Sequence, residues 1–143
     1  PLDFDVSYNI GTREKTQVCL PKMREGKLDG QYLACWVRQG PCDEENSLKA
    51  IDRVDELIRH IYRQVEMNGE QCAIARTPDD LSRLKTEGKK AFYIGIENGY
   101  GIGKDLKNIT RFHDAGVTYI TLCHTRNNDI CDSSSDTTAR WNG

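Results

Sequence analysis

Residues 91–103 read AFYIGIENGYGIG, and this stretch decides the fold. An apolar run of strand length, Ala91 to Ile96, leads into the carboxylate of Glu97 and then into a loop with three glycines. This pattern is typical of a buried strand that ends at a polar site. A carboxylate at the end of an apolar strand is poorly solvated unless a cation, a metal ion or several hydrogen-bond donors lie nearby. Glu97 is therefore the first candidate for a functional residue, and the alternative, a strand-end glutamate that turns out to water, stays open.

The glycines also suggest a phosphate-binding loop, but their spacing argues against one. Residues 99–103 follow a strand and precede a predicted helix, yet Lys104 and Asp105 break both the dinucleotide fingerprint and the P-loop pattern. A doubly wound nucleotide-binding domain is disfavoured for the same reason. The glycines are better explained as residues that let the backbone turn sharply at the rim of a site.

Strand-like and helix-like segments alternate along the rest of the chain. The predicted helices cover residues 18–26, 47–67, 79–87 and 105–115, and the predicted strands cover residues 31–37, 72–75, 91–96 and 117–123. Ser47 is a plausible N-cap for the longest helix, and Thr77 followed by Pro78 is typical of another helix start. This alternation predicts an α/β fold.

A βαβ unit brings a second candidate residue to the same place as Glu97. One helix separates strand 92–96 from strand 117–123, so the two strands are predicted to be parallel neighbours. His124 follows the second strand, and the carboxyl edge of such a sheet or barrel is where ligands bind. We therefore interpret His124 as a functional residue in preference to a core histidine. A polar loop with Asn127, Asn128, Asp129 and Asp132 follows it, and the serines at 133–135 in this loop are interpreted as ordinary solvated residues.

Composition excludes several classes of function. The chain has 143 residues, the size of one domain, and 20 Lys plus Arg against 22 Asp plus Glu leave a net charge of -2. Nothing in this balance recommends a nucleic acid or an anionic membrane surface as a partner. No apolar run approaches the roughly 20 residues that a membrane span requires. The chain starts at Pro1 without an initiating Met, so both ends are expected to be cut and the compartment stays open.

The six cysteines do not form a recognisable zinc or disulfide pattern. None of them makes a Cys-x-x-Cys pair, and no Cys and His residues have zinc-finger spacing. Cys35 and Cys123 lie in apolar, strand-like runs, where a cysteine is usually a small core residue. Free thiols are favoured over a disulfide framework, because the chain is longer than the small scaffolds that need such bonds.

Several motifs in the right order resemble the membrane dipeptidase family (renal dipeptidase, peptidase family M19). The match starts with GIENG at 95–99, followed by TLCH at 121–124 and by Asn128-Asp129 with Asp132-Ser133. It continues in VCLPKMREG at 18–26, ARTxDD at 75–80, EGK at 87–89, and in Phe112 with Gly116, Val117 and Tyr119. The resemblance thus spans nearly the whole chain, although no single motif would suffice.

The resemblance implies a fold, a cofactor and two residue roles. The family consists of zinc-dependent dipeptidases on a (β/α)8 barrel of the TIM type with a two-metal site. By this match Glu97 resembles the carboxylate that bridges both zinc ions, and His124 resembles the histidine that contacts the substrate and the tetrahedral intermediate. Two such ions can activate a water and polarise the scissile carbonyl of a dipeptide substrate.

Departures from the family pattern limit what these residues can do alone. The His-x-Asp metal motif of the first strand is absent, and the resemblance places Pro1 just beyond it. The two further zinc histidines, and the arginine and aspartate that hold substrate, belong to later strands that would follow Gly143. Cys19 stands where the family commonly has an aspartate. Residues 1–143 are thus predicted to be a single domain that forms an incomplete, N-terminal part of the barrel. In isolation this part is predicted neither to bind zinc tightly nor to hydrolyse dipeptides. Its unpaired strand edges could let it associate as a homodimer.

Two alternatives remain at this point. The first is another metal-dependent amidohydrolase on the same barrel, because a fold does not determine a substrate. The second is a non-catalytic binding protein that kept the barrel and lost the metal ions. The upstream His-x-Asp motif and the downstream histidines would distinguish catalysis from binding.

Overall fold

The computed structural model describes residues 8–12 and 17–141, and the chain divides into two compact units. The first unit comprises the described residues of Pro1–Leu33 with Arg59–Ile94, and the second comprises Ala34–Ile58 with the described residues of Gly95–Gly143. The described elements are α1 (Leu20–Glu25), β1 (Gly30–Trp36), α2 (Glu44–Met67), β2 (Cys72–Ile74), α3 (Pro78–Thr86), β3 (Lys90–Glu97), the short 3-10 helix η1 (Gly99–Ile102), α4 (Lys107–Asp114) and β4 (Val117–Ile120). The division between the units falls within β1, α2 and β3.

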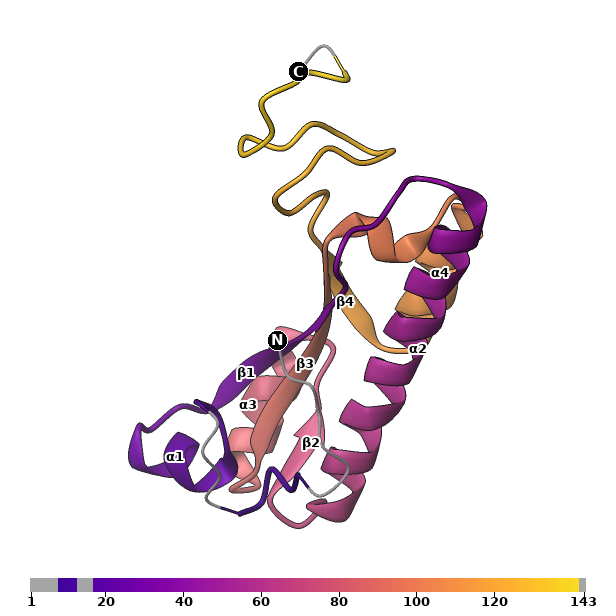
Figure 1. The fold of residues 1–143 in the computed structure, drawn as a ribbon. Helices are drawn as coiled ribbons and strands as arrows, with labels where there is room; N and C mark the ends of the chain where they lie inside the picture. Colours follow the sequence, from indigo (N-terminus) through magenta and orange to yellow (C-terminus); the bar gives the residue numbers. More distant parts are fainter. Residues whose placement is uncertain (1–7, 13–16, 142–143) are drawn as a thin grey trace. The chain divides into compact units, whose positions relative to one another are not determined.

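β3 is the strand to which all the other described strands pair. The sheet order is β1-β3-β2, and β4 also pairs with β3. In the first unit β2 runs parallel to β3, with Cys72 opposite Lys90 and Ile74 opposite Phe92 (Figure 1). In the second unit the backbone N–H of Thr121 donates to the carbonyl of Ile96 at 3.0 Å. The predicted pairing of the two strands on either side of the Glu97 loop is thus confirmed.

The core of the first unit is built around the apolar run of β3. Phe92 is fully buried among side chains from α1, the end of α2 and β2, together with Ile10. That cluster consists of Ile10, Leu20, Met23, Val65, Cys72 and Phe92. On α3, Leu84 packs with Ala75 and Ala91 in a smaller cluster. The alternating faces of one strand thus serve both clusters, as expected of a strand covered on both sides.

α3 begins with the cap that its sequence predicts. The Thr77 hydroxyl accepts from the backbone N–H of Asp80 at 3.2 Å, and one Asp80 carboxylate oxygen accepts in return from the N–H of Thr77 at 3.0 Å. The same oxygen accepts from the N–H of Arg76 at 3.0 Å, and the Arg83 side chain donates to the other oxygen at 3.1 Å. The Arg76 N–H, the Arg83 guanidinium and Thr77 together hold the pKa of the Asp80 carboxyl well below its usual range.

This lowered pKa predicts an acid-dependent loss of stability. A carboxyl group whose pKa is lower in the folded state stabilises the fold above its unfolded pKa, about 3.9, and loses that contribution as the pH falls through the folded value. We expect Asp80→Asn to lower the free energy of unfolding at pH 7, and the difference from wild type to shrink as the pH drops below about 3.9. Urea unfolding of both proteins across this pH range measures the difference. The neighbouring Asp79→Asn is the control, and a pH-independent effect of Asp80→Asn would contradict the prediction.

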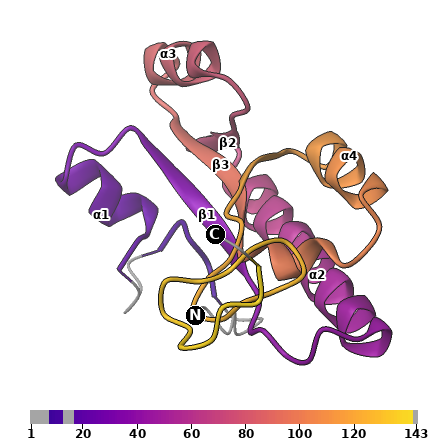
Figure 2. The same cartoon turned by 90° about the horizontal axis from the view of Figure 1, so that it is seen from above.

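In the second unit, α4 and η1 pack against the first half of α2. Phe112 of α4 and Val54 of α2 are fully buried, and Arg111 donates to both carboxylate oxygens of Asp55 at 2.8 and 3.0 Å. Both views show α4 running beside this half of α2 (Figure 2). Gly101 of η1 allows the close approach, because a Cβ there would lie 2.9 Å from a methyl group of Val54. The glycine-rich stretch thus lets the chain turn after β3 and pack closely against α2.

The start of α2 differs from the sequence prediction. The helix begins at Glu44, and the N–H and hydroxyl of Ser47 both donate to the carbonyl of Asp43, at 3.1 and 2.7 Å. The Asp43 carboxylate accepts from the N–H of Asn46 at 2.8 Å, which is the contact that an N-cap side chain makes. The prediction of Ser47 as the N-cap was therefore wrong: Asp43 caps the helix and Ser47 is buried within its first turn.

The structure also bears on membrane insertion. α2 is the longest described helix, with 24 residues, and it carries charged side chains along its exposed face. None of the helices in the described ranges is both long enough and apolar enough to cross a membrane.

Candidate active site

Glu97 and His124 lie together at the carboxyl ends of two paired strands. Glu97 is the last residue of β3, and His124 follows β4 by a few residues. The His124 Nε2 atom lies 3.3 Å from the Glu97 Oε1 atom, and 39% and 38% of the two side chains are exposed. The sequence therefore correctly predicted their proximity. Both groups are solvent-accessible, so the pair can meet a ligand without any rearrangement of the core.

Two neighbours orient His124. The Trp36 ring, at the end of β1, meets the imidazole edge-on, with 6.1 Å between ring centroids and 72° between ring planes. The Ser133 hydroxyl donates to the backbone carbonyl of His124 at 2.7 Å. Ser133 is buried, so the interpretation of the serine run as ordinary solvated loop was wrong for this residue, whereas Ser134 and Ser135 are exposed.

A buried pair of amides supports the loops that carry the two candidate residues. Asn98, directly after Glu97, is almost fully buried, and its side-chain oxygen accepts from the side-chain amide of Asn128 at 3.3 Å. The same amide of Asn128 donates to the carbonyl of Leu122 at 2.8 Å. The backbone N–H of Asn98 donates to the Thr121 hydroxyl at 2.8 Å. Because buried amides are costly unless all are paired, these contacts hold the loop after β3 against the loop after β4.

Sequence reasoning missed the structural importance of both asparagines. Asn98 has a φ of 85°, in the left-handed region, which asparagine tolerates better than most residues. An Asn between a strand-end Glu and a Gly was the available signal. Asn128 was placed in a polar loop, but nothing in its local sequence indicates that it is fully buried.

The segment after His124 is ordered by side-chain hydrogen bonds in place of helix or strand. The Asp132 carboxylate accepts from the backbone N–H groups of Arg140 and Trp141, at 3.0 and 2.9 Å. The Trp141 indole N–H donates to the carbonyl of Asn128 at 2.9 Å, and the Arg140 guanidinium donates to Asp129 at 2.7 Å. Asp132 therefore acts as an anchor for the end of the described chain.

Among the described residues at the strand ends, Glu97 is the side chain that could serve as a metal ligand. Glu97 presents a half-exposed carboxylate, which suits a divalent cation. However, the described ranges contain no group of three or more His, Cys, Asp and Glu side chains that could hold a metal ion. Zinc takes three or four protein ligands, so this part of the chain fits as one contributor to such a centre and not as the whole centre.

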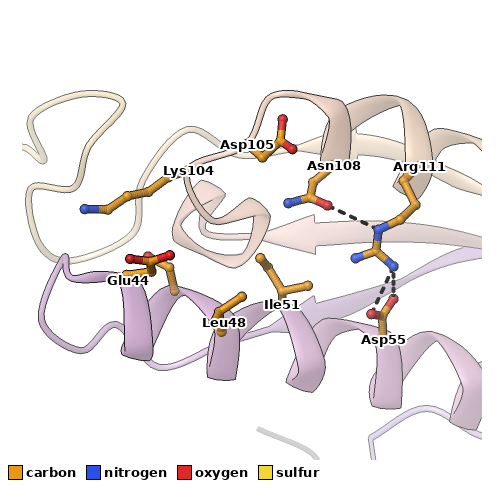
Figure 3. Close-up of a pocket in the computed structure, with 9 residues that line it drawn as sticks. Glu44, Leu48, Ile51, Asp55, Lys104, Asp105, Asn108 and Arg111 are labelled. Carbon is orange, nitrogen blue, oxygen red and sulfur yellow. Dashed lines mark hydrogen bonds and ion pairs between the residues drawn. The ribbon is translucent and has the colours of Figure 1, made fainter.

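A cavity elsewhere in the second unit is separate from this pair. It has a volume of about 480 Å³ and lies between the first half of α2 on one side and α4, with the segment that leads into it, on the other (Figure 3). It is lined by Glu44, Ser47, Leu48, Ile51, Asp55, Lys104, Asp105, Asn108 and Arg111. The Arg111 guanidinium on its wall is already engaged by Asp55 and Asn108. Neither Glu97 nor His124 lines the cavity, so we place the candidate site at the strand ends.

Comparison with known families gives one match over almost the whole chain. The model that describes "Membrane dipeptidase (Peptidase family M19)" matches residues 2–143. Among curated proteins, "Dipeptidase ataJ" of Aspergillus terreus is 29% identical in an alignment of 131 positions, gaps included, that covers 87% of this chain and 32% of that protein. "Uncharacterized dipeptidase C965.12" of Schizosaccharomyces pombe is 24% identical in an alignment of 158 positions, gaps included, that covers 95% of this chain and 37% of that protein. The chain thus spans about a third of the length of these relatives.

Solved structures agree with the fold. The probable dipeptidase PvdM of Pseudomonas aeruginosa superposes with a TM-score of 0.79 at 26% identity, over 87% of this chain and 32% of that one. A metallopeptidase of Rhodobacter sphaeroides, solved with a phosphinate mimic of L-Ala-D-Ala, superposes with a TM-score of 0.70 at 18% identity, over 80% of this chain and 39% of that one. The predicted fold class is therefore confirmed: the chain is α/β with a parallel sheet and matches about a third of a TIM-type barrel of the M19 type.

Proposed function

Because the chain belongs to the membrane dipeptidase family, peptidase family M19, we propose that the whole protein is a zinc-dependent dipeptidase. Its reaction would be hydrolysis of the peptide bond of a dipeptide. Residues 1–143 would form the N-terminal part of the barrel, as a single incomplete domain. On its own this part would be inactive, because Glu97 is the one metal ligand that we assign to it.

The observation that carries the proposal is the contact between Glu97 and His124. A carboxylate and an imidazole, 3.3 Å apart and both half-exposed, lie at the strand ends where barrel enzymes place their active sites. We assign Glu97 the role of metal bridge and His124 the role of substrate ligand. Two zinc ions, when bound, would activate a water and polarise the scissile carbonyl.

The imidazole of His124 can act as a hydrogen-bond donor to a bound dipeptide. Its Nε2 atom, aimed at Glu97, can donate a hydrogen bond to an oxygen of the substrate that is bound beside that carboxylate. A donor placed where negative charge develops stabilises the transition state more than the ground state. Trp36 and Ser133 restrict the ring and its backbone, which reduces the cost of orienting the donor.

Substitution of His124 tests this role. In the full protein with zinc, we expect His124→Gln to lower kcat/KM for a small dipeptide by about 10²-fold, because one transition-state hydrogen bond is lost. Release of free amino acids from a dipeptide panel measures the rate. His113→Gln is the matched control, because His113 lies on α4 with 74% of its side chain exposed.

Two results would count against the proposal in different ways. If His124→Gln kept wild-type activity, the assignment of His124 would be wrong while the dipeptidase remained. If the wild-type protein, loaded with zinc, hydrolysed no dipeptide, the dipeptidase proposal would be wrong. An amidohydrolase with another substrate, or a binding protein on the same barrel, would then be favoured.

A further inference from the structure

Two thiols meet beside His124. Cys123 directly precedes His124, and Cys131 lies in the loop that follows. The Cys123 sulfur lies 3.5 Å from the carbonyl oxygen of Asp132, the residue after Cys131, so the chain returns Cys131 to the neighbourhood of Cys123, where the two thiols interact electrostatically. The sequence prediction that Cys123 is a small core residue was wrong, because β4 ends at Ile120 and Cys123 is only half-buried.

The loop between the two cysteines is held in the shape that keeps them together. The Asn128 side-chain oxygen accepts from the backbone N–H of Ile130 at 2.9 Å and of Cys131 at 3.1 Å. The N–H of Asn128 donates to the carbonyl of Cys131 at 3.1 Å. Asn128 itself is fully buried, so the turn that returns Cys131 to Cys123 is part of the structure around the amide pair.

The other cysteines offer a contrast within the same chain. Burial raises the pKa of the Cys35 thiol to about 12 and that of Cys72 to about 11, so these thiols stay protonated and unreactive. Cys42 is half-buried, like the pair, but its side chain contacts the Arg140 guanidinium. Burial and the neighbouring Cys123 thiol also raise the pKa of the Cys131 thiol, so the pair differs from Cys35 and Cys72 in its partial exposure and in having a second thiol nearby.

We propose that Cys123 and Cys131 form a modification site, a dithiol that low-molecular-weight disulfides such as glutathione disulfide convert reversibly into a Cys123–Cys131 disulfide. The resulting ring would contain His124 and Asn128. It would fix the backbone on both sides of His124. This inference concerns the thiols and does not depend on the proposed peptidase activity.

The disulfide between Cys123 and Cys131 would form by two successive thiol–disulfide exchanges. The thiolate of one cysteine attacks a sulfur of the small disulfide, forms a mixed disulfide and releases one small thiolate. The thiolate of the second cysteine then attacks the protein sulfur of that mixed disulfide and displaces the second small thiolate. The protein loses two protons and two electrons, and the small disulfide is reduced to two thiols. Because both cysteines lie in the same folded segment, the second step is intramolecular and is favoured over a stable mixed disulfide.

Peptide mapping tests the proposal directly, because trypsin cuts between the two cysteines. The full protein is incubated with glutathione disulfide, its remaining thiols are alkylated, and it is digested after Arg126 and Arg140. Cys123 then lies in peptide 112–126 and Cys131 in peptide 127–140, and neither peptide contains another cysteine. We expect mass spectrometry to find these two peptides joined and lighter by two hydrogen atoms than their sum. Treatment with dithiothreitol should separate them again.

Variants sharpen the test. Cys42→Ser is the matched control and should form the bridge as wild type does. In Cys123→Ser and Cys131→Ser the remaining cysteine of the pair should retain glutathione as a mixed disulfide. The proposal is overturned if wild-type peptides 112–126 and 127–140 are recovered separately with alkylated or glutathionylated cysteines, or if either of them is joined to the peptide of Cys42.

Discussion

Glu97→Gln is expected to lower kcat/KM of the full protein for dipeptides by at least about 10³-fold, which is about 4 kcal/mol of transition-state stabilisation. The amide keeps the size and shape of the side chain at the end of β3 but removes its negative charge. In the proposed enzyme that charge would hold both metal ions, and a neutral amide is a far weaker zinc ligand. The measurement is release of free amino acids by wild type and variant at equal protein and zinc concentrations.

Zinc content and a matched substitution separate the causes of such a loss. Glu70→Gln removes an exposed carboxylate outside the site and should leave both activity and zinc content unchanged. Glu97→Gln should lower the bound zinc measured after dialysis, and a chelator should abolish the wild-type rate. A Glu97→Gln protein that retained both its zinc and its turnover would refute the assignment of Glu97 as the metal bridge.

Phe92→Ala is expected to lower the free energy of unfolding by about 3–5 kcal/mol. The Phe92 ring is fully buried in the first unit and is one of the six buried residues that form its larger cluster. Truncation removes the transfer free energy of the ring and leaves a cavity that α1 and β2 cannot fill, because the backbone of β3 is fixed by pairing on both sides. Urea unfolding of the full protein, followed by far-UV circular dichroism, measures the change.

Phe92→Leu provides the comparison. It keeps most of the apolar volume and should cost less than half as much as Phe92→Ala. If the two variants were equally stable, or if Phe92→Ala lost less than about 1 kcal/mol, the packing around Phe92 would be looser than the structure shows.

Much of the fold could be predicted from local sequence, because the relevant signals are short-range. The apolar run before Glu97 predicts a buried strand, and Thr77 with Pro78 predicts a helix start that the structure confirms. The prediction failed where two polar residues one helical turn apart could both serve as the N-cap. Asp43 caps α2 in place of Ser47, since a cap depends on where the preceding chain turns and not on residue type alone.

The candidate pair could also be predicted, and the reason is topological. Two strands joined by one helix run in the same direction, so residues at their carboxyl ends must meet, and Glu97 and His124 do. Their chemical roles stay predictions, which rest on the family resemblance and on the experiments above.

The sequence by itself determined the order of strands and helices, the family resemblance, and the location of Glu97 and His124 at the strand ends. These features could be predicted because periodicity, turn residues and strand direction depend on residues that are neighbours in the sequence. Only the tertiary structure decided which polar side chains are buried and which thiols meet. Asn98 and Asn128 pair because the loops after β3 and β4 converge. Ser133 lies against the backbone of His124, and Cys131 lies near Cys123, because the segment after β4 folds back on itself. Such contacts join residues that are far apart or lie in irregular segments, and no local periodicity records them.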